Sequence, residues 1–309
     1  MFRKAQNTVR IEGILAEVDL RNVSYSNKVG GTTEAIAGTI KVLVDQPIDG
    51  KLMNLEIPVD VFAIKYKNNG DLNPVYESIE KLKTDYVSIA ACGNKEQADK
   101  IRITNASFRK NEFYNQNGEL KSTPRVNASF FSKVTGEFNP EATFTVELFV
   151  SSIAREVDAD GVELDPARLK VQAVVPLYTR EDANALNIDL FDFVATNPNV
   201  INAIESHWEA GKAYKANGKL CFTSKTEKIT DAVDFGESRE RVRTISVHDI
   251  MITGGSETPL DEEESWTIDE IKAGVAARKA RLEALKNKSK KTAETSTAAV
   301  DKKKADLGF

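Results

Sequence analysis

Histidine and cysteine are scarce in this sequence, with two of each among 309 residues. His207 and His248 are far apart, and no Cys/His spacing typical of a zinc site occurs. Cys92 and Cys221 stand alone in different halves, which favours two small core residues over a disulfide and a reducing cytoplasm as the compartment. The sequence also lacks a GxxxxGK[ST] phosphate loop and a GxSxG nucleophile elbow. We therefore expect no cofactor, no metal and no enzymatic activity.

Long apolar runs are absent as well. No stretch approaches the length of a membrane span, and the N-terminus lacks the apolar region of a signal peptide. A hydrophobic content of 41% and a charged content of 29% are typical of soluble globular proteins. We expect a cytoplasmic protein without a membrane partner.

The sequence has no excess of positive charge, and its charged residues are unevenly distributed. The net charge of −5 argues against wholesale affinity for nucleic acid. Residues 1–137 carry 19 Lys/Arg against 17 Asp/Glu, whereas residues 138–256 carry 12 against 19. A basic groove is therefore expected on the first part of the chain rather than the second.

One pattern occurs twice. In residues 186–214 a strand pattern of period two is followed by an Asn-Pro break at Asn197, and then by apolar residues at helical spacing. Residues 55–82 repeat this order around the Asn-Pro break at Asn73. The flanks also match, residues 11–15 with 146–150 and residues 36–44 with 169–177. Each half therefore predicts three strands, one helix and two further strands.

The expected elements follow from these patterns. Strands are predicted near residues 8–20, 34–44, 51–66, 86–92 and 100–108, and then near 142–155, 168–179, 184–195, 219–224 and 241–253. The second helix is expected over 199–210 with Gly211 as its C-cap. A third helix is predicted over 266–286, with Thr267 as N-cap and Asp269 and Glu270 in its first turn.

The order of elements in each half resembles the OB-fold, a five-stranded Greek-key barrel. We predict a mainly β protein with two tandem OB-like barrels, a C-terminal helix and a disordered tail. The first barrel is assigned to residues 1–137 and the second to 138–256, and residues 257–309 form an acidic linker, the helix and a Lys-rich tail. The alternative is two unrelated small β-rich domains whose patterns match by chance.

A basic and aromatic hairpin is predicted over residues 107–134, with Asn117-Gly118 as its turn. Aromatic rings supply faces on which bases stack, and Lys and Arg neutralise phosphates. The alternative is a hairpin whose phenylalanines pack onto the barrel and whose charges are merely solvated.

The whole organisation resembles single-stranded DNA-binding proteins, particularly the divergent ones encoded by bacteriophages. The resemblance rests on the OB-like strand order, the basic-aromatic hairpin and a tail that ends in Phe309. It implies sequence-tolerant binding of single-stranded DNA in replication, recombination or repair, in the host cytoplasm if the protein is phage-encoded. Proteins of this class commonly end in an acidic run and a hydrophobic tip that recruits partners. Here Leu307 and Phe309 preserve the tip, whereas residues 302–304 are lysines.

The resemblance also implies the site residues. The stacking candidates are Tyr25, Tyr66, Phe108, Phe113 and Tyr114. The phosphate-binding candidates are Arg21, Lys28, Lys65, Lys67, Arg109, Lys110, Lys121 and Arg125. Leu307 and Phe309 are candidates for binding replication or recombination proteins, and a homo-oligomer stays open.

Two other functions stay open at this point. One is a phage structural or assembly protein whose barrels bind protein, because a fold does not fix a function. The other is a metal-dependent nuclease whose carboxylates are not recognisable in sequence.

Overall fold

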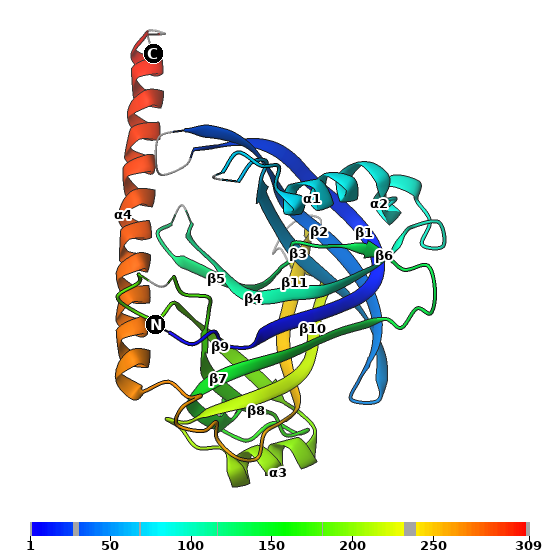
Figure 1. Ribbon diagram of the computed structural model, residues 1–309, viewed down its shortest axis with the longest axis vertical. Coiled ribbons are helices and arrows are strands. Elements are labelled where there is room, and N and C mark those ends of the chain that lie inside the picture. The colour runs from blue at the N-terminus through cyan, green and yellow to red at the C-terminus, as the bar shows by residue number, and fades with distance from the viewer. Residues whose placement is uncertain are drawn as a thin grey trace.

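The computed structural model describes residues 2–26, 31–67, 69–115, 117–180, 182–231 and 239–306, with the side chains of 224–246 and 289–306 excepted. The chain is mainly β, with a long C-terminal helix along one side, and this confirms the predicted fold class (Figure 1). The strands are β1 (Asn7–Ser26), β2 (Thr32–Ile48), β3 (Lys51–Ile64), β4 (Lys100–Tyr114), β5 (Leu120–Asn127), β6 (Ser132–Lys133), β7 (Glu141–Arg155), β8 (Leu169–Pro176), β9 (Ile188–Ala195), β10 (Ala213–Asp231) and β11 (Arg239–Gly255). The helices are α1 (Pro74–Asp85), α2 (Ile89–Cys92), α3 (Pro198–His207) and α4 (Ile268–Asp306).

Strands β1 to β5 close into a barrel. β1 pairs with β2, β2 with β3, β4 with β5 and β1 with β4, all antiparallel. A short parallel pairing of Val59 with Val126 joins β3 to β5 and completes the ring. Gly13 lies where β1 passes from β4 to β2, and a Cβ there would come within 2.5 Å of the Leu43 carbonyl oxygen. Only glycine allows the two strands to approach so closely.

The second half repeats this arrangement. β7, β8 and β9 form an antiparallel meander, β10 pairs with both β7 and β11, and β11 meets β9 in parallel at Phe193. Both helices that follow the third strands begin alike, because Asn73 and Asn197 accept hydrogen bonds from Val75 and Asn199 before a proline at the first helical turn. The repeated Asn-Pro break is therefore a repeated helix start.

The two barrels are joined along one strand pair. The first residues of β1 pair with the first residues of β7, so that all the named strands form one hydrogen-bonded sheet. Gln46 on β2 is 2% exposed, and its side-chain amide bonds the Ala142 backbone and the Leu220 carbonyl of the second half. The boundary that we predicted near residue 138 falls between β6 and β7. Independent folding of the two assigned domains stays a prediction.

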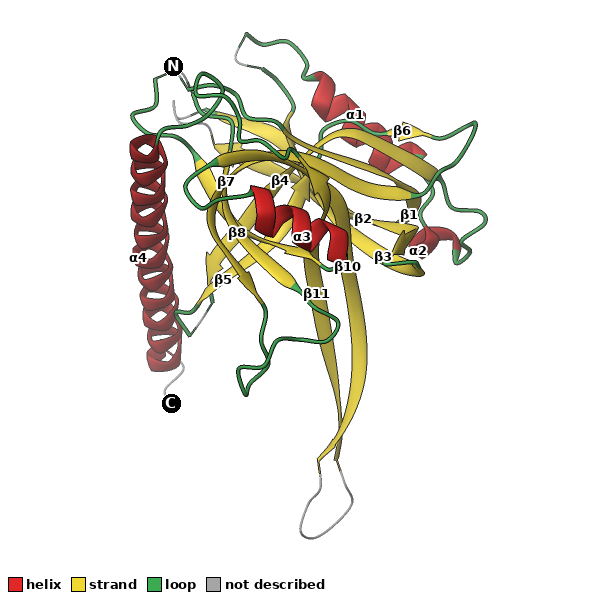
Figure 2. Cartoon of the chain, turned by 90° about the horizontal axis from the view of Figure 1, so that it is seen from below, coloured by secondary structure: helices red, strands yellow, loops and turns green. Residues whose placement is uncertain are grey.

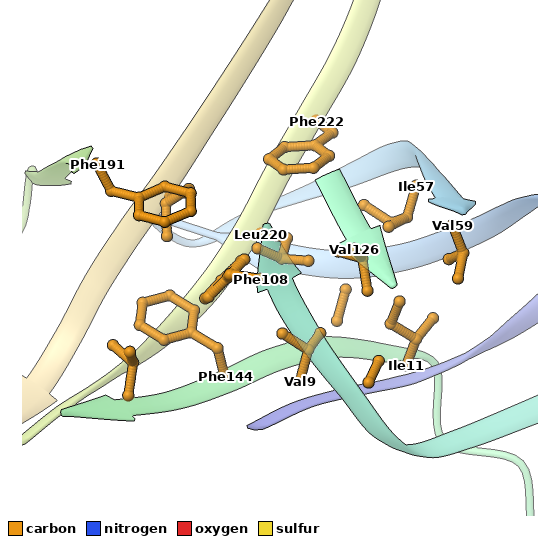
Figure 3. Packing of buried hydrophobic residues seen from close by; sticks show 14 of the residues in the cluster. Val9, Ile11, Ile57, Val59, Phe108, Val126, Phe144, Phe191, Leu220 and Phe222 are labelled. Atoms are coloured by element: carbon orange, nitrogen blue, oxygen red, sulfur yellow. The ribbon is translucent and has the colours of Figure 1, made fainter. Parts of the chain in front are cut away.

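The hydrophobic core is continuous across this junction (Figure 3). Phe108 of β4 is fully buried, with its ring centroid 5.2 Å from that of Phe144 and 5.8 Å from that of Phe191. Offset and tilted aromatic pairs of this kind add about 0.5–1.5 kcal/mol beyond area burial. The hairpin that begins at Phe108 is thus anchored in both halves.

Helix α4 runs along one side of the strands (Figure 2), where it contacts β4 of the first barrel and β9 of the second. Thr267 accepts a hydrogen bond from the Glu270 amide, and the Glu270 carboxylate accepts one from the Thr267 amide, which confirms the predicted N-cap. Trp266 and Ile271 are buried in a second apolar cluster with Leu186 and Ile188. The helix start is therefore part of the folded body.

Two sequence-based expectations about elements are wrong: the strand over residues 86–92 and the end of the second helix at Gly211. Residues 86–92 do not form a strand, because Ser88 caps the short helix α2 and Gly93 ends it in the left-handed conformation. The fourth and fifth strands of the first barrel are instead the two arms of the predicted hairpin. α3 ends at His207 with Trp208 as its C-cap, and the Trp208 ring stacks on Tyr214 with 4.8 Å between the ring centroids. Gly211 lies in the following turn.

The last element to compare with the sequence is the tail. The backbone of the Lys-rich segment 287–304 continues α4 to Asp306, and the disorder that the sequence predicts for this segment stays a prediction. Its Ala, Lys and Glu residues are strong helix formers, and no Gly or Pro interrupts them.

Candidate nucleic-acid interface

An exposed aromatic pair lies on the outer face of β1, β2 and β3. Phe62 and Tyr25 are 51% and 41% exposed, and their rings meet edge to face at 5.4 Å across β2. Ala37 is the cross-strand partner of both Arg21 and Phe62, so that the arginine stands in the same row as the ring. We call Arg21, Tyr25 and Phe62 the strand platform. It offers two ring faces beside a cation.

The platform follows from the period of β3. Val59, Val61 and Ala63 point into the core with at most 4% exposure, so that Phe62 between them must point outward. The sequence analysis did not select Phe62. Continuing the alternation of Leu55 and Ile57 by two further residues would have found it.

Acidic residues limit the platform at its other end. Asp19 and Asp60 lie in the next row, on either side of Thr39, whose hydroxyl donates to Asp60 at 2.8 Å. Farther along, Lys41 bridges Glu17 and Glu56. A polyanion is therefore favoured only at the Arg21 end of the face.

Three further predicted residues follow β3. Tyr66 is 48% exposed, and Lys67 is exposed. The Lys65 ammonium is paired with Glu34 and lies 5.8 Å from the Tyr66 ring centroid. Lys65 is thus already neutralised, whereas Tyr66 and Lys67 stay accessible.

The β4–β5 hairpin carries a second surface. Arg109 pairs directly with Arg125, and Phe113 pairs with Lys121, so that alternation places all four on one face. Phe113 is 49% exposed. We call these four residues the hairpin arm. The β1–β2 and β4–β5 hairpins project toward the same side of the molecule (Figure 1).

The electrostatics of the arm are unusual for a protein surface. Burial lowers the pKa of Arg109, partly opposed by the nearby Asp189. The Nε of Arg125 is buried and has no hydrogen-bond partner among the described residues. Burial, and after it the charge of Arg125, also lower the pKa of His248 on β11. Two opposed arginines without a bonded carboxylate favour an anion.

The other face of the hairpin is turned toward the protein. Phe108 has no exposed surface, so that its ring cannot stack on a base, and its selection as a stacking residue is wrong. The alternation in β4 that points Phe108 inward also turns Lys110 and Tyr114 away from the arm. Burial lowers the pKa of Lys110, whose ammonium lies 5.3 Å from the Phe191 ring centroid.

An ion-pair network holds this inner face against α4 and the second barrel. Glu112 on β4 is paired with Arg278 of α4, and its side chain is 5% exposed. Arg281, one turn farther along α4, reaches Asp189 on β9 at 3.3 Å. Asp189 also accepts a hydrogen bond from the Lys110 amide at 2.9 Å. The network fixes the direction of the arm.

Lys28, Leu307 and Phe309 lie outside the described residues. Their predicted roles stay predictions, as do those of the other selected side chains except Phe108. Among the described residues no group of His, Cys, Asp and Glu could hold a metal ion, and no helix is long and apolar enough to cross a membrane. What the described surfaces offer is stacking and charge neutralisation.

Comparisons with known proteins give one match in sequence and several in fold. A model of the YorF family matches residues 5–288. No curated protein matches the sequence. The fold is similar to the single-stranded DNA-binding protein of Thermus aquaticus, with a TM-score of 0.47 and 10% identity over 84% of this chain and 95% of that chain.

Two other solved structures match this chain to a lower TM-score. A deletion mutant of the Thermus aquaticus protein has a TM-score of 0.42 and 12% identity over 84% of this chain and 97% of that chain. The Plasmodium falciparum SSB in complex with single-stranded DNA has a TM-score of 0.24 and 14% identity over 41% of this chain and 100% of that chain.

Proposed function

This chain belongs to the YorF family, and we propose that it binds single-stranded DNA without sequence preference and without catalysing a reaction on it. The observation that carries the proposal is the pairing of two exposed rings, Phe62 and Tyr25, with the cation of Arg21 beside them. Stacking tolerates every base because every base has a π-face, and phosphate contacts carry no sequence information. Such a surface suits a strand whose bases are unpaired.

The first barrel carries most of the affinity. The platform and the arm are both built from β1 to β5, and residues 1–137 have a small excess of positive charge. The second barrel, with its excess of carboxylates, supports the arm through Asp189. The finer role is protection of single strands in cytoplasmic replication, recombination or repair, with partners recruited through Leu307 and Phe309.

Fluorescence anisotropy with a labelled oligo-dT at two salt concentrations tests the proposal. We expect the logarithm of affinity to fall with the logarithm of salt, at a slope of about −0.7 for each phosphate neutralised. Phe62→Ala should weaken binding by about 5- to 150-fold, which corresponds to the 1–3 kcal/mol of one base stack.

Leu52→Ala is the matched control, because Leu52 is 74% exposed on the same strand at its far end. It should leave affinity unchanged. An absence of oligo-dT binding at low salt, or equal losses for both variants, would contradict the proposal.

A further inference from the structure

A groove of about 610 Å³ lies at the junction of the two barrels. It is lined by the residues before and at the start of β1, by β4, by the loop that follows β5, by β7, and by the end of β8 with the segment after it. Its volume is within the ~300–1,000 Å³ typical of sites for small organic groups. We call it the junction groove.

Two exposed aromatic rings line this groove. Phe130 is 51% exposed and Tyr178 is 64% exposed, and they come from opposite halves of the chain. An aromatic ring that leaves half of its surface in water gains little from the core. The groove thus has one stacking face on each side of the junction.

The groove also has a cation at its edge. Arg109 lines it and is at the same time part of the hairpin arm. Arg109 makes no ion pair or hydrogen bond to any described residue, and burial lowers its pKa. Glu147, the one carboxylate in the lining, accepts hydrogen bonds from Arg3 at 2.8 Å and from the Gln6 amide at 2.9 Å. The carboxylate of the lining is therefore neutralised, whereas Arg109, which with Lys4 is one of two cationic side chains in the lining, has no bonded partner among the described residues.

A polar side chain with both donors and acceptors completes the lining. Asn105 lies in an irregular stretch of β4, where the register to β1 shifts between Val9 and Ile11. Such bulges re-aim side chains at functional sites. Its amide is exposed and makes no hydrogen bond to a described residue, so that it is available to a base edge.

The geometry points to a nucleotide site in the junction groove that extends the DNA path from the first barrel to the second, with Tyr178 and Phe130 stacking on bases and Arg109 holding the phosphate between them and the arm. This inference rests on the proposed function. It adds that DNA strands long enough to extend beyond the hairpin arm gain a second set of contacts. One of these contacts, the Tyr178 ring, comes from the second half of the chain.

A length series of oligo-dT, from about 6 to 30 nucleotides, separates this site from the first barrel, because one OB-fold occupies about 4–16 nucleotides. In the full chain, Phe62→Ala should weaken binding at every length. Tyr178→Ala should leave the shortest strands unaffected and weaken the longest at least about fivefold. Val162→Ala, at another exposed apolar residue of the second half, should have no effect at any length.

A crosslinking experiment locates the strand directly. Long oligo-dT substituted with 5-iodouracil should crosslink on irradiation to peptides that contain Tyr178 or Phe130. The groove site would be overturned if Tyr178→Ala bound oligo-dT of every length as tightly as the wild type does and if the crosslinks were confined to Tyr25 and Phe62. The proposed function would then remain intact. No wild-type binding at any length would refute both.

Discussion

Arg109 and Arg125 are direct cross-strand partners on β4 and β5, so that two guanidinium groups share one face of the hairpin arm. Like charges directly opposite each other destabilise a strand pair by about 0.2–1 kcal/mol. The stability of the fold therefore does not explain why two arginines face each other at this position. A bound phosphate does, because both guanidinium groups could hold it.

The first prediction follows from this pair. Arg125→Gln should increase the free energy of unfolding slightly, weaken oligo-dT binding and make the salt slope shallower by about 0.7. The pKa of His248 should rise toward its ordinary value of 6.5, because Arg125 is one of the groups that lower it. Denaturant unfolding, anisotropy and an NMR titration measure the three effects. Lys81→Gln, on the exposed surface of α1, is the control and should change none of them.

The second prediction compares two phenylalanines of β4. Phe108→Ala should cost about 3–5 kcal/mol of stability, because it leaves a cavity between Phe144 and Phe191. Phe113→Ala should leave stability nearly unchanged and weaken DNA binding, since its ring is 49% exposed. Thermal unfolding and anisotropy on both variants test this contrast. Equal destabilisation by the two substitutions would show that the arm's outer face is packed.

The third prediction concerns pH and the network at α4. Burial raises the pKa of Asp189 above its ordinary value of 3.8, in spite of the Lys110 amide and Arg281. The folded protein therefore binds this proton more tightly than the unfolded chain, and the contribution of Asp189 to stability declines as pH rises from about 4 through the raised pKa.

Asp189→Asn tests this sign. The amide oxygen can still accept from the Lys110 amide, so that the variant should show a flatter dependence of unfolding free energy on pH in that window. Asp192→Asn, at an exposed carboxylate of the same strand, is the control. A steeper dependence for Asp189→Asn would mean that the pair with Arg281 outweighs burial.

The fourth prediction divides α4 into two functional parts. Deleting residues 289–309 should leave the melting temperature unchanged, because Ile271, Arg278 and Lys286, through which α4 contacts the strands and the hairpin, precede the deletion. Trp266→Ala should lower it, because the indole is 5% exposed and lies under the Arg3 guanidinium at 4.6 Å. If the deleted lysines contact DNA, the dependence of DNA affinity on salt concentration becomes shallower after the deletion. If Leu307 and Phe309 dock on a partner, only partner binding is lost. A large drop in melting temperature after the deletion would contradict this division.

The sequence predicted the fold better than the site. The period of two in β3 and β9 and the two Asn-Pro helix starts are local signals, so that the order of elements in each half was accessible. Residues 86–92 were misassigned because an apolar run of that length fits a strand or a short helix equally, and Ser88 decided between them. The assignment of β4 and β5 changed with it.

The site depended on which face each ring occupies, and composition does not contain that information. Phe108 and Phe113 lie five residues apart in the same strand, yet one is buried and the other exposed. Tyr178 and Phe130 meet at the groove only because β1 pairs with β7, a contact between residues more than a hundred positions apart. Phe62, by contrast, could have been found from alternation alone.

The contact of Phe108 with Phe144 and Phe191 has a consequence for how this family can change over generations. A substitution that alters the size of one ring leaves a void or an overlap in the other half of the molecule, and not only in its own. Although the two halves have one architecture, they cannot diverge independently at these positions. Among relatives, the side-chain volumes at positions 108, 144 and 191 should covary. The residues at positions 62 and 113 should instead vary with the ligand that each relative binds.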